Sequence, residues 1–296
     1  MHHILSGPTL VYCGFRKGVS KMALLQEIDG TKKISLKDFD PEAHGGIDKE
    51  KAHSRTIDLE KELCELQELL YAAQQTPVLI VLQGLDTSGK DGTISHAMSS
   101  MNPQSCRVAS FKVPTPLELS HDFLWRVHSE APGKGAIVIF NRSHYEDVLV
   151  VRVHKMINDS ECKRRYAHIN NFERLLSDAN TIVLKFFLHI TKDEQEQRLL
   201  ARERDPIKAW KLSAADWKER EFWDDYQGAY QDAINQCAKP HAPWYVVPAN
   251  HKWFRNLAVA ETIVNALRPH REEWLARLTE IGSVALKELR AQRQSH

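Results

Sequence analysis

The stretch 84-GLDTSGKD-91 combines glycines, a lysine and two acids at a spacing that suits phosphate binding. It follows an apolar run, and Gly84, Gly89 and Lys90 match the Gly-x₄-Gly-Lys pattern of a P-loop. In such a loop, backbone N–H groups and the start of the next helix surround a phosphate while the lysine reaches more distal oxygens. A βα turn without a ligand is the alternative. The context favours phosphate binding by Gly84, Ser88, Gly89, Lys90, Asp91, Gly92 and Thr93.

The two acids of this loop predict a divalent cation. Asp91 stands where most P-loops have Ser or Thr, and Asp86 lies inside the loop. A carboxylate and a phosphate about 4 Å apart repel each other by roughly 4 kcal/mol at an effective dielectric constant of 20, so we expect a cation between them. Mg²⁺, or Mn²⁺ in its place, prefers such oxygen ligands. We predict that Asp86 binds the metal, whereas Asp91 either binds it or caps the helix.

A second polar group follows the apolar run 136-AIVIF-140. Asn141 ends the run where P-loop enzymes often have an acid, and Arg142, Glu146 and Asp147 come next. The carboxyl ends of parallel strands form the edge at which open α/β sheets bind ligands. We therefore expect Arg142 to contact phosphate rather than to form a surface ion pair.

A third group is basic and lies late in the chain. Arg198 and Arg202 are four residues apart on a predicted helix that ends at Pro206, and Lys208 and Lys211 follow. Nearby acids balance these charges only in part, which favours phosphate contact over a solvated helix face. In nucleotide kinases a mobile segment of this kind closes over the phosphates and excludes water. We predict a lid at about residues 202–222.

The elements that must position these groups alternate along the chain. Predicted strands cover residues 78–82, 107–112, 136–140, 181–190 and 244–248, with helical patterns between them. Such alternation predicts an α/β fold of three layers with a mainly parallel sheet, a P-loop kinase-like fold similar to that of thymidylate kinase. Residues 1–55 look like an irregular N-terminal extension, and 56–296 like the kinase domain. Apolar residues from Leu59 to Leu70 indicate a helix that begins near Ile57, and a C-terminal docking helix is expected at about 270–292.

Composition limits the other possibilities. A chain of 296 residues with 42% hydrophobic residues can form one domain with a lid. The net charge of +1 gives no general attraction to nucleic acids or membranes, and no signal peptide or transmembrane segment is evident. Five scattered cysteines without CxxC spacing favour reduced thiols and a cytoplasmic protein.

Several of these segments together resemble the polyphosphate kinase 2 family. The resemblance runs from about residue 30 to about 268. It includes the sequences GLDTSGKDGTI, RVASFKVPTPLELSHDFLWRVH, IVIFNRSHYEDVLVVRVH, ERDPIKAWKLSAADW, FWDDYQGAY and HAPWYVVPANHKWFRNLAV. Asn141 within NRSHYEDVLV is similar to the class III branch, because other branches have Asp there. That branch implies reversible transfer of phosphate from inorganic polyphosphate to both AMP and ADP. Whether guanine nucleotides are also acceptors is left open by the sequence.

The resemblance also implies roles for individual residues. Asp86 is similar to the metal-organising acid, Lys90 to the P-loop lysine and Arg142 to a phosphate ligand, while Asn141 and Glu146 are similar to a class-marking pair near the nucleotide. In the lid, the resemblance gives polyphosphate or transition-state contacts to Arg202, Lys208 and Lys211, and less clearly to Arg198. The acceptor nucleotide would lie near Lys112, Asp122 and Arg126. Phe123 and Trp125 are expected to be core aromatics, although ligand contact is the alternative.

Phosphoryl transfer to a nucleotide phosphate requires no strong general base, since the acceptor oxygen is already ionised near neutral pH. The chain would therefore align the reactants and offset charge, with Asp86 as a Mg²⁺ ligand. Two alternatives stay open: a nucleoside monophosphate kinase that uses ATP as the donor, and a P-loop nucleotide-binding protein without catalysis. The family resemblance implies a homodimer or a homotetramer.

Overall fold

The computed structural model describes residues 23–205, 207 and 214–294. Within these ranges, five parallel strands form one sheet in the order β2-β3-β1-β4-β5. The strands are β1 (Val78–Gln83), β2 (Cys106–Ser110), β3 (Ile137–Asn141), β4 (Ile182–His189) and β5 (Trp244–Pro248). All five predicted strands are confirmed, with small shifts at their ends.

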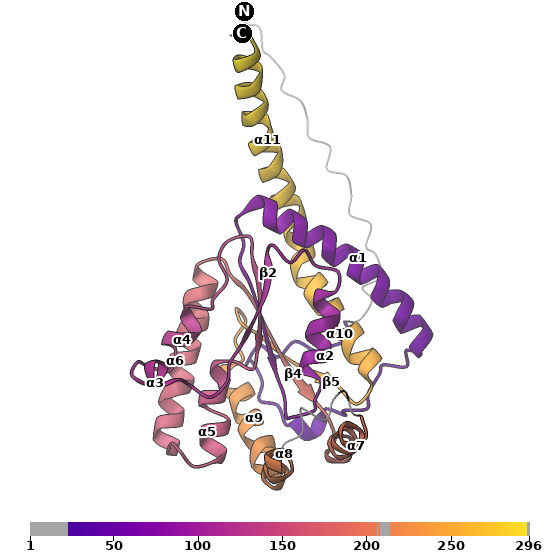
Figure 1. Ribbon diagram of the computed structural model, residues 1–296, viewed down its shortest axis with the longest axis vertical. Helices are drawn as coiled ribbons and strands as arrows, with labels where there is room; N and C mark the ends of the chain where they lie inside the picture. The colour runs from indigo at the N-terminus through magenta and orange to yellow at the C-terminus, as the bar shows by residue number, and fades with distance from the viewer. Residues whose placement is uncertain (1–22, 206, 208–213, 295–296) are drawn as a thin grey trace, which may run out of the picture.

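Helices cover both faces of this sheet (Figure 1). The longer helices are α1 (Lys49–Ala73), α2 (Lys90–Met98), α6 (Asp159–Asp178), α7 (Lys192–Glu203), α9 (Trp223–Cys237), α10 (Lys252–Leu267) and α11 (Arg271–Gln294). Short helical segments are η1 (Leu36–Asp38), α3 (Pro116–Leu119), α4 (Trp125–His128), η2 (His144–Asp147), α5 (Val150–Val153), α8 (Ala214–Glu219), η4 (Arg220–Phe222) and η5 (Arg268–His270).

The central strand β1 shows why the fold has three layers. Its side chains alternate between the two faces, as they must in any strand. Val78, Ile80 and Leu82 join the core beneath α1 and α10, whereas Leu79 and Val81 join the core beneath α6 and α9. Every residue of β1 is buried. The predicted three-layer α/β fold is therefore confirmed.

The N-terminal region differs from the expectation. Helix α1 begins at Lys49, before the predicted start at Ile57, because the Asp48 side chain accepts a hydrogen bond from the Lys51 N–H and caps the helix. Ahead of it, Ile28 forms an antiparallel bridge with Trp244 at the edge of β5. The described part of the extension is thus packed against the domain.

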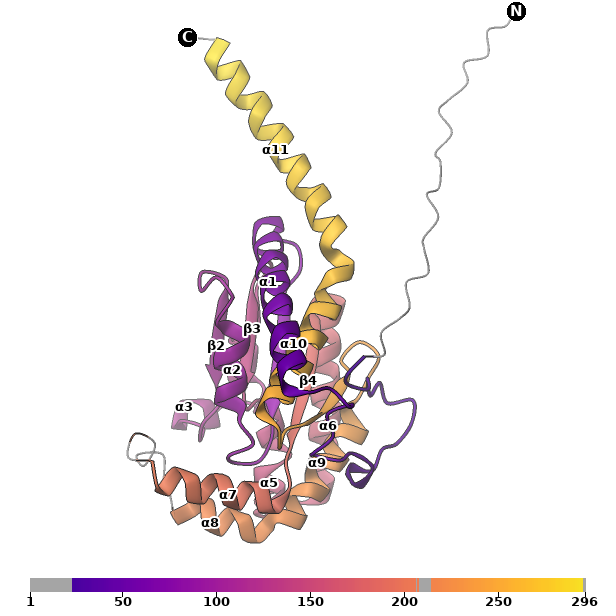
Figure 2. The same cartoon turned by 90° about the vertical axis from the view of Figure 1, so that its right-hand side faces the viewer.

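The C-terminal helix was expected to dock, and this expectation is wrong for most of its length. Only Trp274 of α11 is buried; it packs beside α1 and donates a hydrogen bond to Thr76 Oγ1. Beyond it, α11 projects away from the body of the protein (Figure 2). No described helix is long and apolar enough to span a membrane.

Candidate active site

The P-loop is formed where β1 passes into α2. Gly84 has φ 154°, and a Cβ there would lie 2.6 Å from Ser88 Oγ and 2.9 Å from the Leu188 carbonyl oxygen. Gly89 caps α2 at φ 104°, and a Cβ there would collide with the Arg255 guanidinium. Both positions therefore require glycine, since a side chain would be strained and obstructed. The loop is closely packed from behind.

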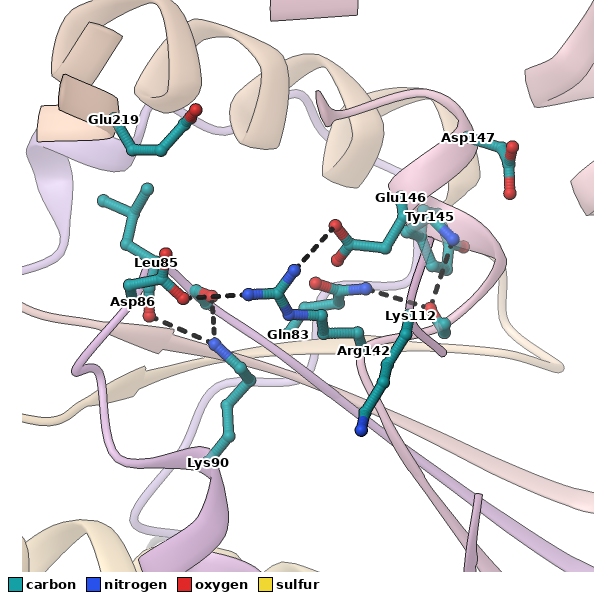
Figure 3. Close-up of polar contacts among 12 residues, drawn as sticks. Gln83, Leu85, Asp86, Lys90, Lys112, Arg142, Tyr145, Glu146, Asp147 and Glu219 are labelled. Atoms are coloured by element: carbon teal, nitrogen blue, oxygen red, sulfur yellow. Dashed lines mark hydrogen bonds and ion pairs between the residues drawn. The ribbon is translucent and has the colours of Figure 1, made fainter. Parts of the chain in front are cut away.

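Lys90 lies over this loop at the start of α2 (Figure 3). Its Nζ donates hydrogen bonds to the carbonyl oxygens of Gly84 (2.6 Å) and Leu85 (3.1 Å). Burial lowers the pKa of Lys90, and the Asp86 carboxylate opposes that change. The ammonium group therefore lies inside the loop, where the oxygens of a bound phosphate could accept hydrogen bonds from it.

Asp86, Arg142 and Glu146 form a cluster of charges beside Lys90, here called the open cluster (Figure 3). Arg142 Nη2 is 2.9 Å from Asp86 Oδ1, and Arg142 Nη1 is 3.9 Å from Glu146 Oε2. The Arg142 side chain is nevertheless 43% exposed. Although Arg142 is paired with both acids, an anion in solution can still reach its guanidinium group.

The pKa values of Arg142 and Glu146 are shifted by burial and by the charges gathered at the carboxyl ends of β1 and β3. Burial raises the pKa of Glu146, while Arg142 and Lys90 oppose the rise. Burial also lowers the pKa of Arg142, but Glu146 and Asp86 outweigh it and the net pKa is raised. Arg142 has φ 61°, an uncommon left-handed conformation for a non-glycine residue. Strain of this kind is often kept at functional sites.

The remaining loop residues have different surroundings. Asn141 donates a hydrogen bond of 3.0 Å to Asp91 Oδ1 and thus joins the end of β3 to the first turn of α2. Thr93 Oγ1 bonds back to the Gly89 carbonyl within the helix, and a Cβ on Gly92 would face Arg255. Ser88 Oγ is buried and has no hydrogen-bond partner among the described atoms. Such a hydroxyl is free to bind a ligand atom.

The predicted lid residues separate into two groups. Arg198 donates to four backbone carbonyls, those of Thr87, Ser88, Ala249 and Asn250. It braces the P-loop from outside, and phosphate contact by Arg198 stays a prediction.

Arg202, one helical turn later, lies 3.4 Å from Asp216 of α8. Burial and the negative charge of Asp86 raise the pKa of Asp216. The Asp216 carboxylate of α8 therefore interacts electrostatically with the P-loop acid. Lys208 and Lys211 lie outside the described residues.

The predicted acceptor side is less compact. Lys112 is exposed just after β2. Arg126 is buried and binds the Lys112 carbonyl at 2.8 Å, with Asp147 Oδ2 at 3.6 Å. Asp122 instead accepts from the Leu124 N–H and lines a separate cavity of about 680 Å³ between α4 and α6. The structure therefore does not bring Asp122 and Arg126 into contact with Lys90.

Of the two aromatics expected in the core, one was predicted correctly. Phe123 is partly buried and packs against the core beneath α6 and α9. Trp125 is 42% exposed and stacks on His121, so its assignment to the core is wrong. Trp125 is the first residue of the four-residue helix α4, which buries Arg126 and Val127 instead.

Residues distant in the sequence complete the site and were missed. Arg255 of α10 is buried against Gly89, where burial and the neighbouring Arg198 lower its pKa to about 10. Gln83, at the end of β1, donates a hydrogen bond to Ser143 beside Arg142. Gln83 was visible as a polar end to an apolar strand, whereas no local spacing indicates Arg255.

Comparisons with known proteins agree with this geometry. The family model for polyphosphate kinase 2 (PPK2) matches residues 46–274. The chain is 50% identical over 237 residues to AMP/ADP-polyphosphate phosphotransferase of Meiothermus ruber, covering 79% of this chain and 89% of that protein. It is 46% identical over 217 residues to ADP-polyphosphate phosphotransferase of Rhodopseudomonas palustris, covering 69% and 75%.

A solved structure gives the same result. The crystal structure of polyphosphate kinase 2 from Arthrobacter aurescens TC1 superposes with a TM-score of 0.78 at 40% sequence identity, covering 83% of this chain and 92% of that one. The family match includes the P-loop, the open cluster and the helices that brace them. This chain belongs to the polyphosphate kinase 2 family.

Proposed function

We propose that this protein is a polyphosphate-dependent nucleotide kinase. It transfers the terminal phosphoryl group of inorganic polyphosphate to AMP and ADP, giving ADP and ATP, and the reaction is reversible. The observation that carries the proposal is the open cluster beside Lys90, an exposed arginine held between two acids at the mouth of a P-loop. A relative that is 50% identical and is named AMP/ADP-polyphosphate phosphotransferase supports the choice of donor and acceptors.

The residues of this chain would act mainly by aligning and neutralising phosphates. The acceptor oxygen of AMP or ADP is already ionised, so no side chain needs to remove a proton. Lys90 and Arg142 would stabilise the oxygens of the phosphoryl group in transit, because both cations lie at the loop and can bind where charge develops. The N–H groups at the start of α2 would hold a neighbouring phosphate.

Mg²⁺ fits the donors at this site, and Mn²⁺ would fit in its place. Asp86 offers a partly exposed carboxylate at the loop, and its side chain is 33% exposed. Among the described residues no three His, Cys, Asp or Glu side chains form a metal cluster. A cation held by one or two carboxylates, with phosphates and water as its other ligands, matches the habit of Mg²⁺. When bound, it would neutralise charge on the phosphates.

The lid would supply further positive charge for a long polyanion. Arg202 pairs with Asp216 on the P-loop side, and Lys208 and Lys211 follow in the sequence. Because binding of a polyanion releases counterions, the KM for polyphosphate should rise with salt. An acceptor nucleotide has fewer charges, so its KM should depend less on salt.

The deciding experiment is an ATP-formation assay with Mg²⁺, either AMP or ADP, and inorganic polyphosphate as the only phosphoryl donor. We expect product from both nucleotides and a loss of about 10³-fold or more in Asp86→Asn. Asp178→Asn is the matched control, since Asp178 ends α6 just before β4 begins, at the amino ends of the strands and away from the P-loop. Product from ATP plus a monophosphate, with none from polyphosphate, would instead identify an ordinary nucleoside monophosphate kinase.

Other parts of the proposal concern the setting of the enzyme. Cys64, Cys106, Cys162 and Cys237 are free thiols, and this supports a reducing, cytoplasmic location. GMP and GDP tested in the same assay would show whether guanine nucleotides are acceptors. A homo-oligomer is proposed as well, and sedimentation of the purified protein would measure its size.

A further inference from the structure

Beyond Trp274, α11 presents an apolar stripe to the solvent. An α-helix turns once in about 3.6 residues, so side chains three, four and seven positions apart share one side. Ile281, Leu286 and Leu289 are 42%, 55% and 48% exposed, while Leu275 and Leu278 are half-buried near the base. The stripe consists of Leu275, Leu278, Ile281, Gly282, Ala285, Leu286 and Leu289.

No described part of the chain covers the outer half of this stripe. Figures 1 and 2 both show α11 leaving the body of the protein as a single helix. The match to the family model ends at Trp274, the residue at which burial of α11 also ends. Of the large apolar side chains exposed beyond Leu278, only Val284 lies off the stripe, and a helix with such a stripe usually gains its stability from a packing partner. The outer helix therefore lies beyond the part of the chain that the family model matches.

The charges beside the stripe show which partner would fit. In the first half of α11 acids predominate, with Glu272, Glu273 and Glu280 against Arg271 and Arg277. In the second half bases predominate, with Lys287, Arg290 and Arg293 against Glu288. A helix whose two halves carry opposite charge is complementary to a reversed copy of itself.

We propose that the stripe of α11 binds the same stripe of a second copy, so that the two helices pair antiparallel about a two-fold axis near Gly282. This symmetry sets Leu278 opposite Ala285 of the second copy. On one flank Arg277 then lies beside Glu288 of the second copy, and on the other Glu272 lies beside Arg290. The two-fold axis repeats each contact.

Gly282 supports this position for the axis. Glycine weakens the interior of a helix, so its presence in the stripe needs a reason. Outside its own helix, no described residue of the chain lies within 4 Å of where its Cβ would be. A missing side chain at the crossing point would let the two backbones approach closely. Gly282 is thus suited to a contact that only a second helix can supply.

A cysteine near the axis gives a direct test. We expect Gly282→Cys to form a disulfide between two copies under mild oxidation, seen as a dimer on a non-reducing gel. Ser283→Cys is the matched control, because it lies one residue further along and about 100° around the helix, away from the stripe. Wild-type protein reports any dimer formed by the natural cysteines. Equal cross-linking in both variants, or none above wild type, would overturn the proposal.

Charge exchange tests the antiparallel direction. Arg277→Glu and Glu288→Arg should each weaken α11 pairing by about tenfold, because each places like charges side by side twice in the dimer. The double variant restores opposite charges and should recover the wild-type association constant, as measured by sedimentation equilibrium. Activity per protomer should stay unchanged, which would show that the domain is folded. Additive losses in the double variant, or no loss in either single variant, would refute the pairing.

Discussion

Two charged clusters share one short segment of the chain and differ in nearly every physical respect. Arg142 and Glu146, four residues apart in this segment, belong to the open cluster with Asp86. Between them, His144 and Tyr145 turn the other way and join Glu173 and Lys185 in what we call the sealed cluster. The open cluster faces solvent, whereas His144, Glu173 and Lys185 are wholly buried.

In the sealed cluster every strong charge has a close partner. Glu173 accepts hydrogen bonds from Lys185 (2.6 Å) and Tyr145 (2.8 Å), and His144 Nε2 lies 3.1 Å from the same carboxylate. Lys185 also donates to the Cys237 carbonyl at 2.7 Å. Burial acts to raise the pKa of Glu173, but Lys185 and His144 outweigh it and the net pKa is lowered.

This difference separates a structural use of charge from a functional one. Mutual neutralisation leaves the sealed cluster with no charge to offer a ligand, but it anchors the turn that carries Arg142 in its strained conformation. The open cluster is incompletely paired and accessible, which suits a site that must exchange protein contacts for phosphate contacts. We therefore expect substitutions to affect activity in one cluster and stability in the other.

The largest effect is expected at Arg142. Arg142→Gln should lower kcat/KM for polyphosphate-driven phosphorylation by about 10³-fold, since it removes a cation from the phosphoryl group in transit. The free energy of unfolding should change by less than about 1 kcal/mol, because the arginine is partly exposed. Steady-state kinetics and urea unfolding measure the two quantities. An activity loss below tenfold would show that Arg142 does not stabilise the phosphoryl group during transfer.

The opposite pattern is expected in the sealed cluster. Glu173→Gln leaves Lys185 charged in the core without a carboxylate, which should lower the free energy of unfolding by about 3–5 kcal/mol. The double variant Glu173→Gln with Lys185→Met should recover part of this loss, because no charge stays buried. Urea unfolding of both variants at low temperature checks this. If the single variant were as stable as wild type, the sealed cluster would not anchor the turn.

A smaller, pH-dependent effect is expected at His189, which is buried at the end of β4 and forms no ion pair within 4 Å with any described residue. Burial lowers its pKa to about 4, against an opposing influence of Asp40. The unfolded chain would bind a proton near pH 6.5. Stability from the neutral imidazole is thus complete above about pH 6.5 and is lost as the pH falls towards 4, by about 2–3 kcal/mol.

His189→Gln removes this titration. Urea unfolding at pH 7 and pH 4.5 should show a smaller loss of stability on acidification in the variant than in wild type. If the free energies of unfolding of wild type and variant differed by the same amount at pH 7 and at pH 4.5, His189 would not titrate as its burial predicts. Such a result would also argue against a large cost of burying a charged imidazole without an ion-pair partner in this protein.

Much of the fold was predictable because its signals are local. The apolar runs that became strands and the Gly-x₄-Gly-Lys turn between β1 and α2 each depend on neighbours in the sequence. The start of α1 was missed because its first turns are polar and are held by the Asp48 cap rather than by an apolar face. The docking of α11 was overestimated because an apolar stripe does not reveal what covers it.

The sequence by itself determined the phosphate loop, the identity of Lys90 and Asp86 within it, and the parallel α/β class. These depend on backbone freedom at glycine and on periodicity, which are properties of contiguous residues. Only the tertiary structure decided that Arg142 pairs with Asp86, that Arg198 braces loop carbonyls and that Arg255 lies against Gly89. These contacts depend on the order of strands in the sheet, and that order is set by packing among residues far apart in the chain.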